Sequence, residues 1–299
     1  MTEPRPLCAE ASLGRGEPLA ATASRVEHWL LVEYGGYWPY DPLDAVIFAG
    51  SLREYLAHQL ARLRCARLVL VKRHGRERGD RVRVFYGVTR ERDRRFFTLE
   101  LDGHPDLLDL DVAAALLGNA EQPGTPLEQP LLLVCTHGVR DRCCARYGQA
   151  LFRAARARER AWTWQASHVG GDRFAGNVVA LPEGLYFGRV GADAFPTLLD
   201  EYLAGRIALE WYRGASCYPM RLQAAEIAVR RATGLTGLDD LRFAGREGNR
   251  VRFRAEVAGD VYEVETAEDV AGEEAFLTCR GRRPRRARQF LAGPPALVS

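Results

Sequence analysis

The stretch Leu131–Gly148, LLLVCTHGVRDRCCARYG, runs from a continuous apolar segment through a short polar loop into a segment with helical spacing. Residues 131–134 are typical of a strand buried on both faces, and the residues from Cys144 onwards predict a helix. In a strand–loop–helix unit the end of the strand and the start of the helix meet at one edge of the sheet, where α/β proteins place their sites. The stretch therefore predicts an α/β unit whose three cysteines and one histidine gather at that edge.

The same order of elements occurs earlier in the chain. A strand-like run at 29–33 ends before Gly35-Gly36, as the run at 131–135 ends before Gly138. The first copy then predicts a helix at 51–64, strands at 66–72, 81–88 and 94–102, and a helix at 106–118. The second copy predicts a helix at 144–161, strands at 162–167, 177–181 and 185–190, and a helix at 193–206.

This shared β-α-β-β-α order, with an extra strand in the first copy, suits a thioredoxin-like α/β fold with a mixed central sheet. We therefore expect an α/β protein of tandem thioredoxin-like units, followed by a small C-terminal α+β element. An α/β chain without an internal repeat would show a similar alternation and is the alternative. The expected domains are a first unit at 1–120, a linker at 121–130, a second unit at 131–213, and a C-terminal helix and strands with a basic tail at 214–299.

The composition is that of an ordinary globular protein. The chain has 299 residues, of which 47% are hydrophobic and 27% charged, and a net charge of +3 whose excess lies in the basic tail at 280–288, expected to be solvated. This balance argues against nucleic-acid binding, and no apolar run approaches the ~18 residues of a membrane helix. The start of the chain lacks the regions of a signal peptide, so we expect a cytoplasmic protein. Seven cysteines, an odd number, then indicate metal or redox chemistry rather than a disulfide framework.

Four residues of the second copy are candidate metal ligands. Cys135 ends a strand and Cys144 begins the following helix. His168 ends the next strand, and Asp172 follows it by four positions. The unpaired N–H groups at a helix start favour thiolate over thiol, and thiolate is the form that binds metal. The pattern therefore predicts two sulfurs, one imidazole and one carboxylate at neighbouring strand ends.

Two motifs resemble a known family. CTHGVRDRCC at 135–144 and SHVGGDRFAGNVVALPEGLYFGRV at 167–190 are similar to the sucrase/ferredoxin-like family, as are the segments 7–33 and 212–226. The resemblance implies a thioredoxin-like ferredoxin with a [2Fe–2S] cluster, held by two cysteines nine positions apart and two histidines in an HxGGH pattern. Cys135 and Cys144 match the cysteines and His168 matches the first histidine, while Asp172 stands where the second histidine would be.

The departure at Asp172 leaves the fourth ligand open. A carboxylate can ligate iron and, as a harder anionic donor, would lower the cluster potential relative to imidazole. Alternatively Asp172 accepts a hydrogen bond from the His168 ring, and Cys143 or His137 completes the site.

Three further residues are candidate contacts of the cofactor. Arg140 is expected to shape the loop between the ligands through an ion pair with Asp141. Arg173 and Asn177 are expected to donate hydrogen bonds to the cluster sulfides, with capping of nearby backbone as the alternative. The remaining cysteines are expected to be packed thiols, Cys217 being the nearest of them to the site: Cys8, Cys65, Cys217 and Cys279.

The expected function is one-electron transfer between redox partner proteins. A hydrolase is disfavoured, because the chain shows no pair of carboxylates flanked by aromatic residues as in a sugar-cleaving site. Glu33 takes the place of Cys135 in the first copy, so that copy is expected to lack a cluster. Two alternatives remain: a cluster-free thiol redox enzyme or sensor that uses Cys143 and Cys144, and a zinc-stabilised interaction module.

Overall fold

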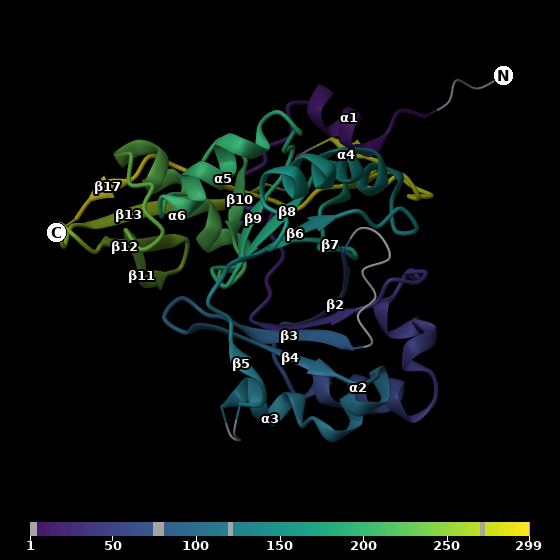
Figure 1. The fold of residues 1–299 in the computed structure, drawn as a ribbon. Coiled ribbons are helices and arrows are strands. Elements are labelled where there is room, and N and C mark those ends of the chain that lie inside the picture. The colour runs from purple at the N-terminus through teal and green to yellow at the C-terminus, as the bar shows by residue number, and fades with distance from the viewer. Residues whose placement is uncertain (1–4, 74–80, 119–121, 270–272, 299) are drawn as a thin grey trace.

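Two half-sheets with the same strand order form the centre of the molecule (Figure 1). The computed structural model describes residues 5–73, 81–118, 122–269 and 273–298. The strands of the first half-sheet are β1 (His28–Glu33), β2 (Ala66–Lys72), β3 (Val82–Thr89) and β4 (Arg94–Leu101). Those of the second are β6 (Leu131–Cys135), β7 (Thr163–Ala166), β8 (Val178–Leu181) and β9 (Leu185–Phe187). The spatial orders, β2-β1-β3-β4 and β7-β6-β8-β9, are equivalent.

The two half-sheets join edge to edge into one curled, mixed sheet of ten strands. In each half the first two strands run parallel, and the remaining pairs are antiparallel. β2 pairs antiparallel with β7 through Val71 opposite Ala166 and Lys72 opposite Gln165. Two short strands lie at the outer ends: β5 (Thr125–Pro126), within the predicted linker, and β10 (Tyr212–Ala215). Residues 119–121, around the predicted start of the linker, lie outside the described residues.

Alternate strand residues enter different apolar layers. Four helices cover the outer faces of the half-sheets: α2 (Ser51–Ala61), α3 (Val112–Leu117), α4 (Arg142–Arg158) and α5 (Phe195–Leu203). Leu30 packs in the layer of α2 and α3, and Leu132 packs in the layer of α4 and α5. Trp29 and Leu133 belong instead to an inner cluster that both half-sheets share. The central strands β1 and β6 are therefore buried on both faces, which explains their unbroken apolar runs.

The predicted helix at 106–118 is wrong in its extent. The structure has a 3₁₀ helix at His104–Asp109, followed by α3. Leu110 between them is extended, and the Asp111 side chain accepts a hydrogen bond from the Ala114 N–H, which starts a new helix. The other 3₁₀ helices are Pro42–Asp44, Val46–Phe48 and Asp172–Phe174.

The C-terminal part adds helix α6 (Met220–Thr233) and a second, small sheet. Its strands are β11 (Leu241–Glu247), β12 (Arg250–Ala255), β13 (Val261–Asp269), β16 (Gln289–Ala292) and β17 (Ala296–Leu297). Ala225 of α6 and Phe253 of β12 share one apolar cluster with Leu198 of α5, so this part packs on the second half-sheet. The arginines of the basic tail at 280–288 are exposed, as expected of a solvated segment. Within the tail β15 (Arg285–Arg286) pairs with β14 (Glu274–Ala275), and after it β16 pairs with β13.

The first described helix, α1 (Cys8–Gly14), lies beside the start of α4 and contacts the 3₁₀ helix at 172–174. The loop between β14 and β15 reaches the same place from the other end of the chain. Within the described residues, no helix has the length and apolar character needed to span a bilayer.

Candidate metal centre

The strand–loop–helix segment forms one wall of the candidate site. β6 ends at Cys135, and Asp141 caps α4 by accepting a hydrogen bond from the Cys143 N–H at 2.8 Å. Cys144 therefore lies in the first turn of α4. Both ligand candidates are buried, with 1% of Cys135 and none of Cys144 exposed.

His168 reaches the two cysteines from the loop that follows β7. One donor atom from each of Cys135, Cys144 and His168 lies within 4.8 Å of the others. The structure thus brings together the three residues that the sequence places at neighbouring strand ends. The His168 side chain is 17% exposed, so the site is closed on the sulfur side and open on the imidazole side.

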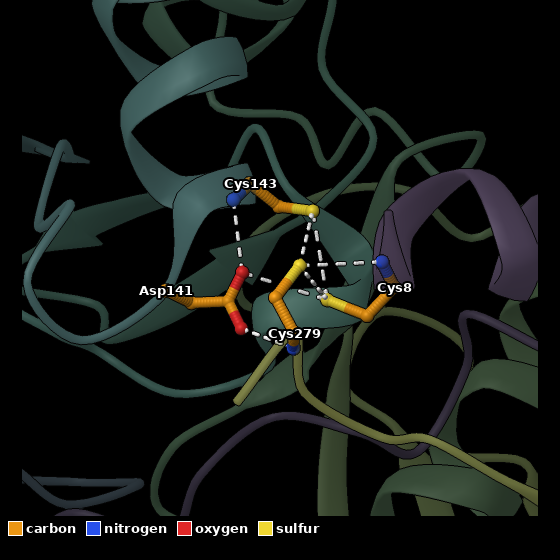
Figure 2. A group of neighbouring side chains, drawn as sticks. All are labelled: Cys8, Asp141, Cys143 and Cys279. Carbon is orange, nitrogen blue, oxygen red and sulfur yellow. Dashed lines mark hydrogen bonds between the residues drawn. The ribbon is translucent and has the colours of Figure 1, made fainter. Parts of the chain in front are cut away.

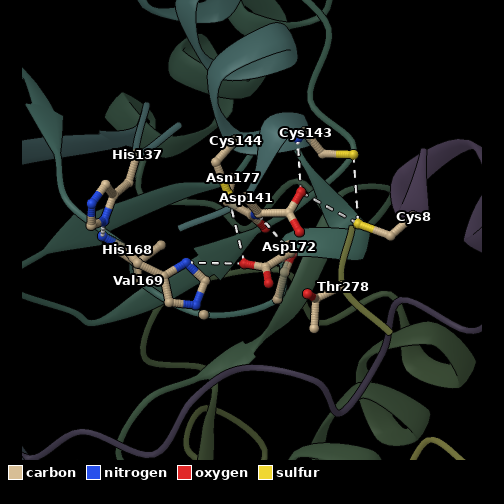
Figure 3. A network of polar contacts seen from close by, with 12 residues as sticks. Cys8, His137, Asp141, Cys143, Cys144, His168, Val169, Asp172, Asn177 and Thr278 are labelled. Atoms are coloured by element: carbon tan, nitrogen blue, oxygen red, sulfur yellow. Dashed lines mark hydrogen bonds and ion pairs between the residues drawn. The ribbon is translucent and has the colours of Figure 1, made fainter. Parts of the chain in front are cut away.

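Asp172 lies against both the imidazole and one thiol (Figure 3). Its Oδ1 atom is 3.0 Å from His168 Nδ1 and 3.7 Å from Cys144 Sγ. Although near the carboxylate, the buried His168 Nδ1 is not aligned for a hydrogen bond and has no hydrogen-bond partner among the described residues. Asp172 is therefore available as a fourth donor or as a partner of the imidazole ring.

A fully buried arginine fixes the loop that carries His168 and Asp172. Arg213 Nη1 donates to the Gly170 carbonyl at 3.0 Å and to Asn177 Oδ1 at 2.8 Å. Asn177 Nδ2 in turn donates to the Gly171 carbonyl at 2.9 Å. Gly170 and Gly171 both have positive φ, and a Cβ on Gly171 would lie 2.2 Å from Arg213 Nη2. The two glycines therefore allow the turn and the close approach of the guanidinium.

The three predicted cofactor contacts take different places in the structure. Asn177 binds backbone and Arg213, as just described. Arg173 Nε donates to Glu17 Oε1 at 2.6 Å, and its guanidinium also lies over the Phe174 ring. The predicted ion pair of Arg140 with Asp141 is wrong: within the described residues the Arg140 guanidinium lies 3.9 Å from the centre of the Tyr40 ring instead. All three therefore support the loops around the site through these contacts.

His137 positions the ligand loop through both ring nitrogens. Its Nδ1 accepts the backbone N–H of His168 at 3.1 Å, so its Nε2 donates to the Trp38 carbonyl at 3.3 Å. Of the three fourth-ligand candidates, Asp172 lies at the site, whereas both nitrogens of His137 are already used and Cys143 contacts other cysteines.

Electrostatics favour a thiolate at Cys135. A hydrogen bond from the Cys144 thiol, and a second contact with the His168 ring, lower the pKa of Cys135 well below its usual value despite burial. The contact with Cys135, together with burial, raises the pKa of Cys144. Burial likewise raises the pKa of the Asp172 carboxyl. A metal ion binds both sulfurs as thiolates, so its binding would displace any proton that they hold.

Cys143, next to Cys144 in sequence, joins a different group of side chains. Its sulfur lies 3.5 Å from the sulfurs of both Cys8 and Cys279. Cys8 and Cys279 were expected to be packed thiols, and Cys217 was expected to lie nearest to the site. Cys217 instead packs beside the apolar cluster of α6. The adjacency of Cys143 and Cys144 could have indicated a second group. Side chains of successive helical residues point about 100° apart, so the two sulfurs cannot readily bind the same small ion.

The comparisons with known proteins agree with the geometry. The family model described as sucrase/ferredoxin-like matches residues 19–214. A curated relative, "Altered inheritance of mitochondria protein 32" of Clavispora lusitaniae, is 33% identical over 99 residues, which cover 30% of this chain and 36% of that protein. The aligned part is thus well under half of the relative's length. No solved structure matches the chain significantly. Because the family match takes in both half-sheets and all four residues of the candidate site, the chain belongs to the sucrase/ferredoxin-like family.

Proposed function

We propose that this protein transfers single electrons through a [2Fe–2S] cluster bound by Cys135, Cys144, His168 and Asp172. The observation that carries the proposal is the meeting of two thiols and an imidazole, with donor atoms within 4.8 Å of one another, at one buried edge of the sheet. Thiolate and imidazole together are the ligand types of Rieske-type [2Fe–2S] centres. Membership of the sucrase/ferredoxin-like family supports the same chemistry.

The donor set fits such a cluster. The two adjacent sulfurs would serve one iron, and His168 and Asp172 would serve the other. A buried polar atom that makes no hydrogen bond is costly, and His168 Nδ1 makes none among the described residues, although Asp172 Oδ1 lies 3.0 Å from it. Coordination by that atom would remove the cost, and the carboxylate oxygen 3.0 Å away would supply the remaining donor.

When bound, the cluster would supply a one-electron couple. An anionic carboxylate in place of a second imidazole stabilises the oxidised cluster, so we expect a lower reduction potential than a two-histidine site would give. The chain itself would hold the two thiolates behind α4 and exclude water from them. The His168 edge, the exposed side of the site, would face the redox partner protein.

The proposal also covers the relation between the two half-sheets. We propose that the two half-sheets are diverged thioredoxin-like units, with equivalent strand orders, and that only the second binds a cluster. Glu33 ends β1 where Cys135 ends β6, and its side chain accepts a hydrogen bond from the Arg83 N–H at 3.3 Å. The first unit would then be a docking or structural part. We also propose that the protein acts in the cytoplasm and exchanges electrons with other proteins.

The compactness of the site favours a second candidate, a single zinc ion. Donor atoms within 4.8 Å of one another are close enough for one tetrahedral ion with Zn–S bonds of ~2.3 Å. Such a site would stabilise the fold without a redox function. Cys135, Cys144, His168 and Asp172 would then be its four ligands.

Metal analysis of the anaerobically purified full chain tests the proposal. We expect about two irons and two acid-labile sulfides per chain, a red-brown colour, and an electron paramagnetic resonance signal after reduction. Cys144→Ser should lose at least nine tenths of the iron, whereas Cys65→Ser, in the turn before β2, should retain it.

The other outcomes separate the alternatives. An iron-free chain in which Cys144→Ser removes bound zinc would support the single-ion site. A chain that binds neither metal and whose Cys143 and Cys144 thiols titrate freely would support thiol redox chemistry. Either outcome would end the electron-carrier proposal.

A further inference from the structure

A second group of metal-binding side chains joins three distant segments at the start of α4 (Figure 2). Cys8 begins α1, Asp141 and Cys143 flank the first residue of α4, and Cys279 lies in the loop between β14 and β15. One donor atom from each residue lies within 4.8 Å of the others, and all four residues are buried. None of the four belongs to the donor set of Cys135, Cys144 and His168.

The three sulfurs form a nearly equilateral triangle. The sulfur of Cys143 lies 3.5 Å from that of Cys8 and 3.5 Å from that of Cys279, and the third side is 3.6 Å. Disulfide sulfurs would lie only ~2.05 Å apart. A tetrahedral zinc ion with ~2.3 Å bonds holds its sulfurs ~3.8 Å apart, so the triangle has the size of one tetrahedral face.

Asp141 is held in position to supply the fourth corner. Its Oδ1 lies 3.6 Å from Cys8 Sγ and accepts the Cys143 N–H at 2.8 Å. Its Oδ2 accepts the Cys279 N–H at 2.6 Å. Hydrogen bonds of this kind orient ligating carboxylates. Asp141 is fully buried, and among the described residues no arginine or lysine forms an ion pair with it. A bound cation would balance its negative charge.

Backbone N–H groups also point at the sulfurs. The Cys8 N–H donates to Cys279 Sγ at 3.4 Å, and the Ala9 N–H donates to Cys143 Sγ at 3.5 Å. Hydrogen-bond donors favour the charged form of an acidic group, here thiolate over thiol. Two of the three sulfurs thus accept backbone hydrogen bonds, as metal-bound thiolates can.

We propose that Cys8, Asp141, Cys143 and Cys279 form a structural zinc site. Three thiolates and one carboxylate make a closed, four-coordinate donor set, which is typical of structural zinc rather than of a catalytic ion with an open position. An iron–sulfur cluster that takes one thiolate per iron would need its sulfurs farther apart. The ion ties α1 and the C-terminal loop to the helix start that also carries Cys144. This inference does not depend on the identity of the cofactor at Cys144.

Zinc content of single variants tests the site on the full chain. The wild-type chain should hold about one zinc that a weak chelator does not remove. Cys8→Ser and Cys279→Ser should each lower zinc at least tenfold and leave iron, sulfide and visible spectrum at wild-type levels. Cys217→Ser is the matched control, because it removes a half-buried cysteine outside both donor groups, and it should keep its zinc.

Cobalt uptake by the wild-type chain provides a readout that does not depend on the folding of a variant. After removal of zinc under reducing conditions, Co²⁺ should bind once per chain with thiolate-to-cobalt charge-transfer bands and the d–d bands of a tetrahedral site. Zinc retained in both Cys8→Ser and Cys279→Ser would overturn the proposal. So would a wild-type chain that takes up neither ion there. Zinc lost only in Cys144→Ser would instead assign it to the first site.

Discussion

Cys143 and Cys144 are adjacent in sequence, yet their sulfurs belong to two separate groups of donors. Cys143 contacts Cys8 and Cys279, whereas Cys144 contacts Asp172 and lies with Cys135 and His168. One helix start thus takes part in both sites. A change at this point of the chain therefore acts on the candidate metal site and on the contact that joins Cys8 and Cys279 to α4.

Gly148→Ala should loosen the candidate metal site. A Cβ on Gly148 would lie 1.9 Å from the Cys135 carbonyl oxygen, so α4 would have to move away from the end of β6. Overpacking of this kind costs about 1–3 kcal/mol of unfolding free energy. We expect that loss in urea unfolding, together with lower iron occupancy.

Ala150→Gly, on the exposed face of the same helix, is the matched control. It should cost about 1 kcal/mol through helix propensity alone and leave iron occupancy unchanged. Equal iron occupancy in the Gly148→Ala variant and in the wild-type chain would contradict the close packing of helix and strand.

Asp172→His should raise the reduction potential of the centre. Replacing an anionic donor by a neutral imidazole removes negative charge from the oxidised and reduced forms alike, which favours the reduced one. The potential is measured by redox titration. Asp193→His, in an exposed turn, should leave it unchanged. A potential that did not respond to Asp172→His would show that residue 172 does not contact the redox centre.

Arg213→Met should destabilise the loop that carries His168. The change leaves buried acceptors of Thr22, Gly170 and Asn177 without their donor, and each unsatisfied group costs about 1–3 kcal/mol. Burial lowers the pKa of Arg213 only to about 10, so the side chain is charged at neutral pH. We expect a lower midpoint of urea unfolding and weaker metal retention.

Arg153→Met, on the exposed face of α4, is the matched control. It should change the urea midpoint and the metal retention by no more than a few tenths of the Arg213→Met effect. Similar behaviour of the two variants would contradict a specific role of Arg213 in holding the loop.

His28 should make stability depend on pH. Its Nδ1 lies 2.7 Å from the Arg64 carbonyl and its Nε2 lies 2.9 Å from an Arg90 nitrogen, and burial lowers its pKa below 6.5. The unfolded chain therefore binds the proton more tightly, so this contribution is complete above pH 6.5 and is lost as the pH falls through the folded-state pKa.

Urea unfolding at several pH values checks this dependence. The advantage of the wild-type chain over His28→Gln should shrink as the pH falls. His58→Gln, on the exposed face of α2, should show no such trend. A constant difference between wild type and His28→Gln would contradict the assignment.

Local patterns in the sequence were enough to bring together most of the candidate metal site. Cys135, Cys144 and His168 lie at ends of elements whose periodicity is clear, and the topology of an α/β unit brings such ends together. Hydrophobic spacing alone predicts a single helix at 106–118. It does not show that the Asp111 side chain caps a new helix and so divides this segment in two. The sequence likewise gave no indication that Arg213 holds the ligand loop, because a lone arginine in a strand-like run carries no pattern.

Contacts between distant segments were out of reach of the same reasoning. Cys8 and Cys279 lie at opposite ends of the chain, and only the packing of α1 and of the β14–β15 loop against α4 brings them to Cys143. The pairing of β2 with β7 was equally hidden, because any exposed edge of either half-sheet offers the same backbone groups.

That pairing gives the molecule the character of a dimer folded from one chain. β2 and β7 hold equivalent positions in the two halves, and antiparallel contact between equivalent edges is what a two-fold axis produces in a homodimer. In a homodimer a mutation changes both subunits at once. Here each half can change by itself while the pairing of β2 with β7 is kept. Glu33 can therefore stand at the end of β1 while Cys135 stays at the end of β6.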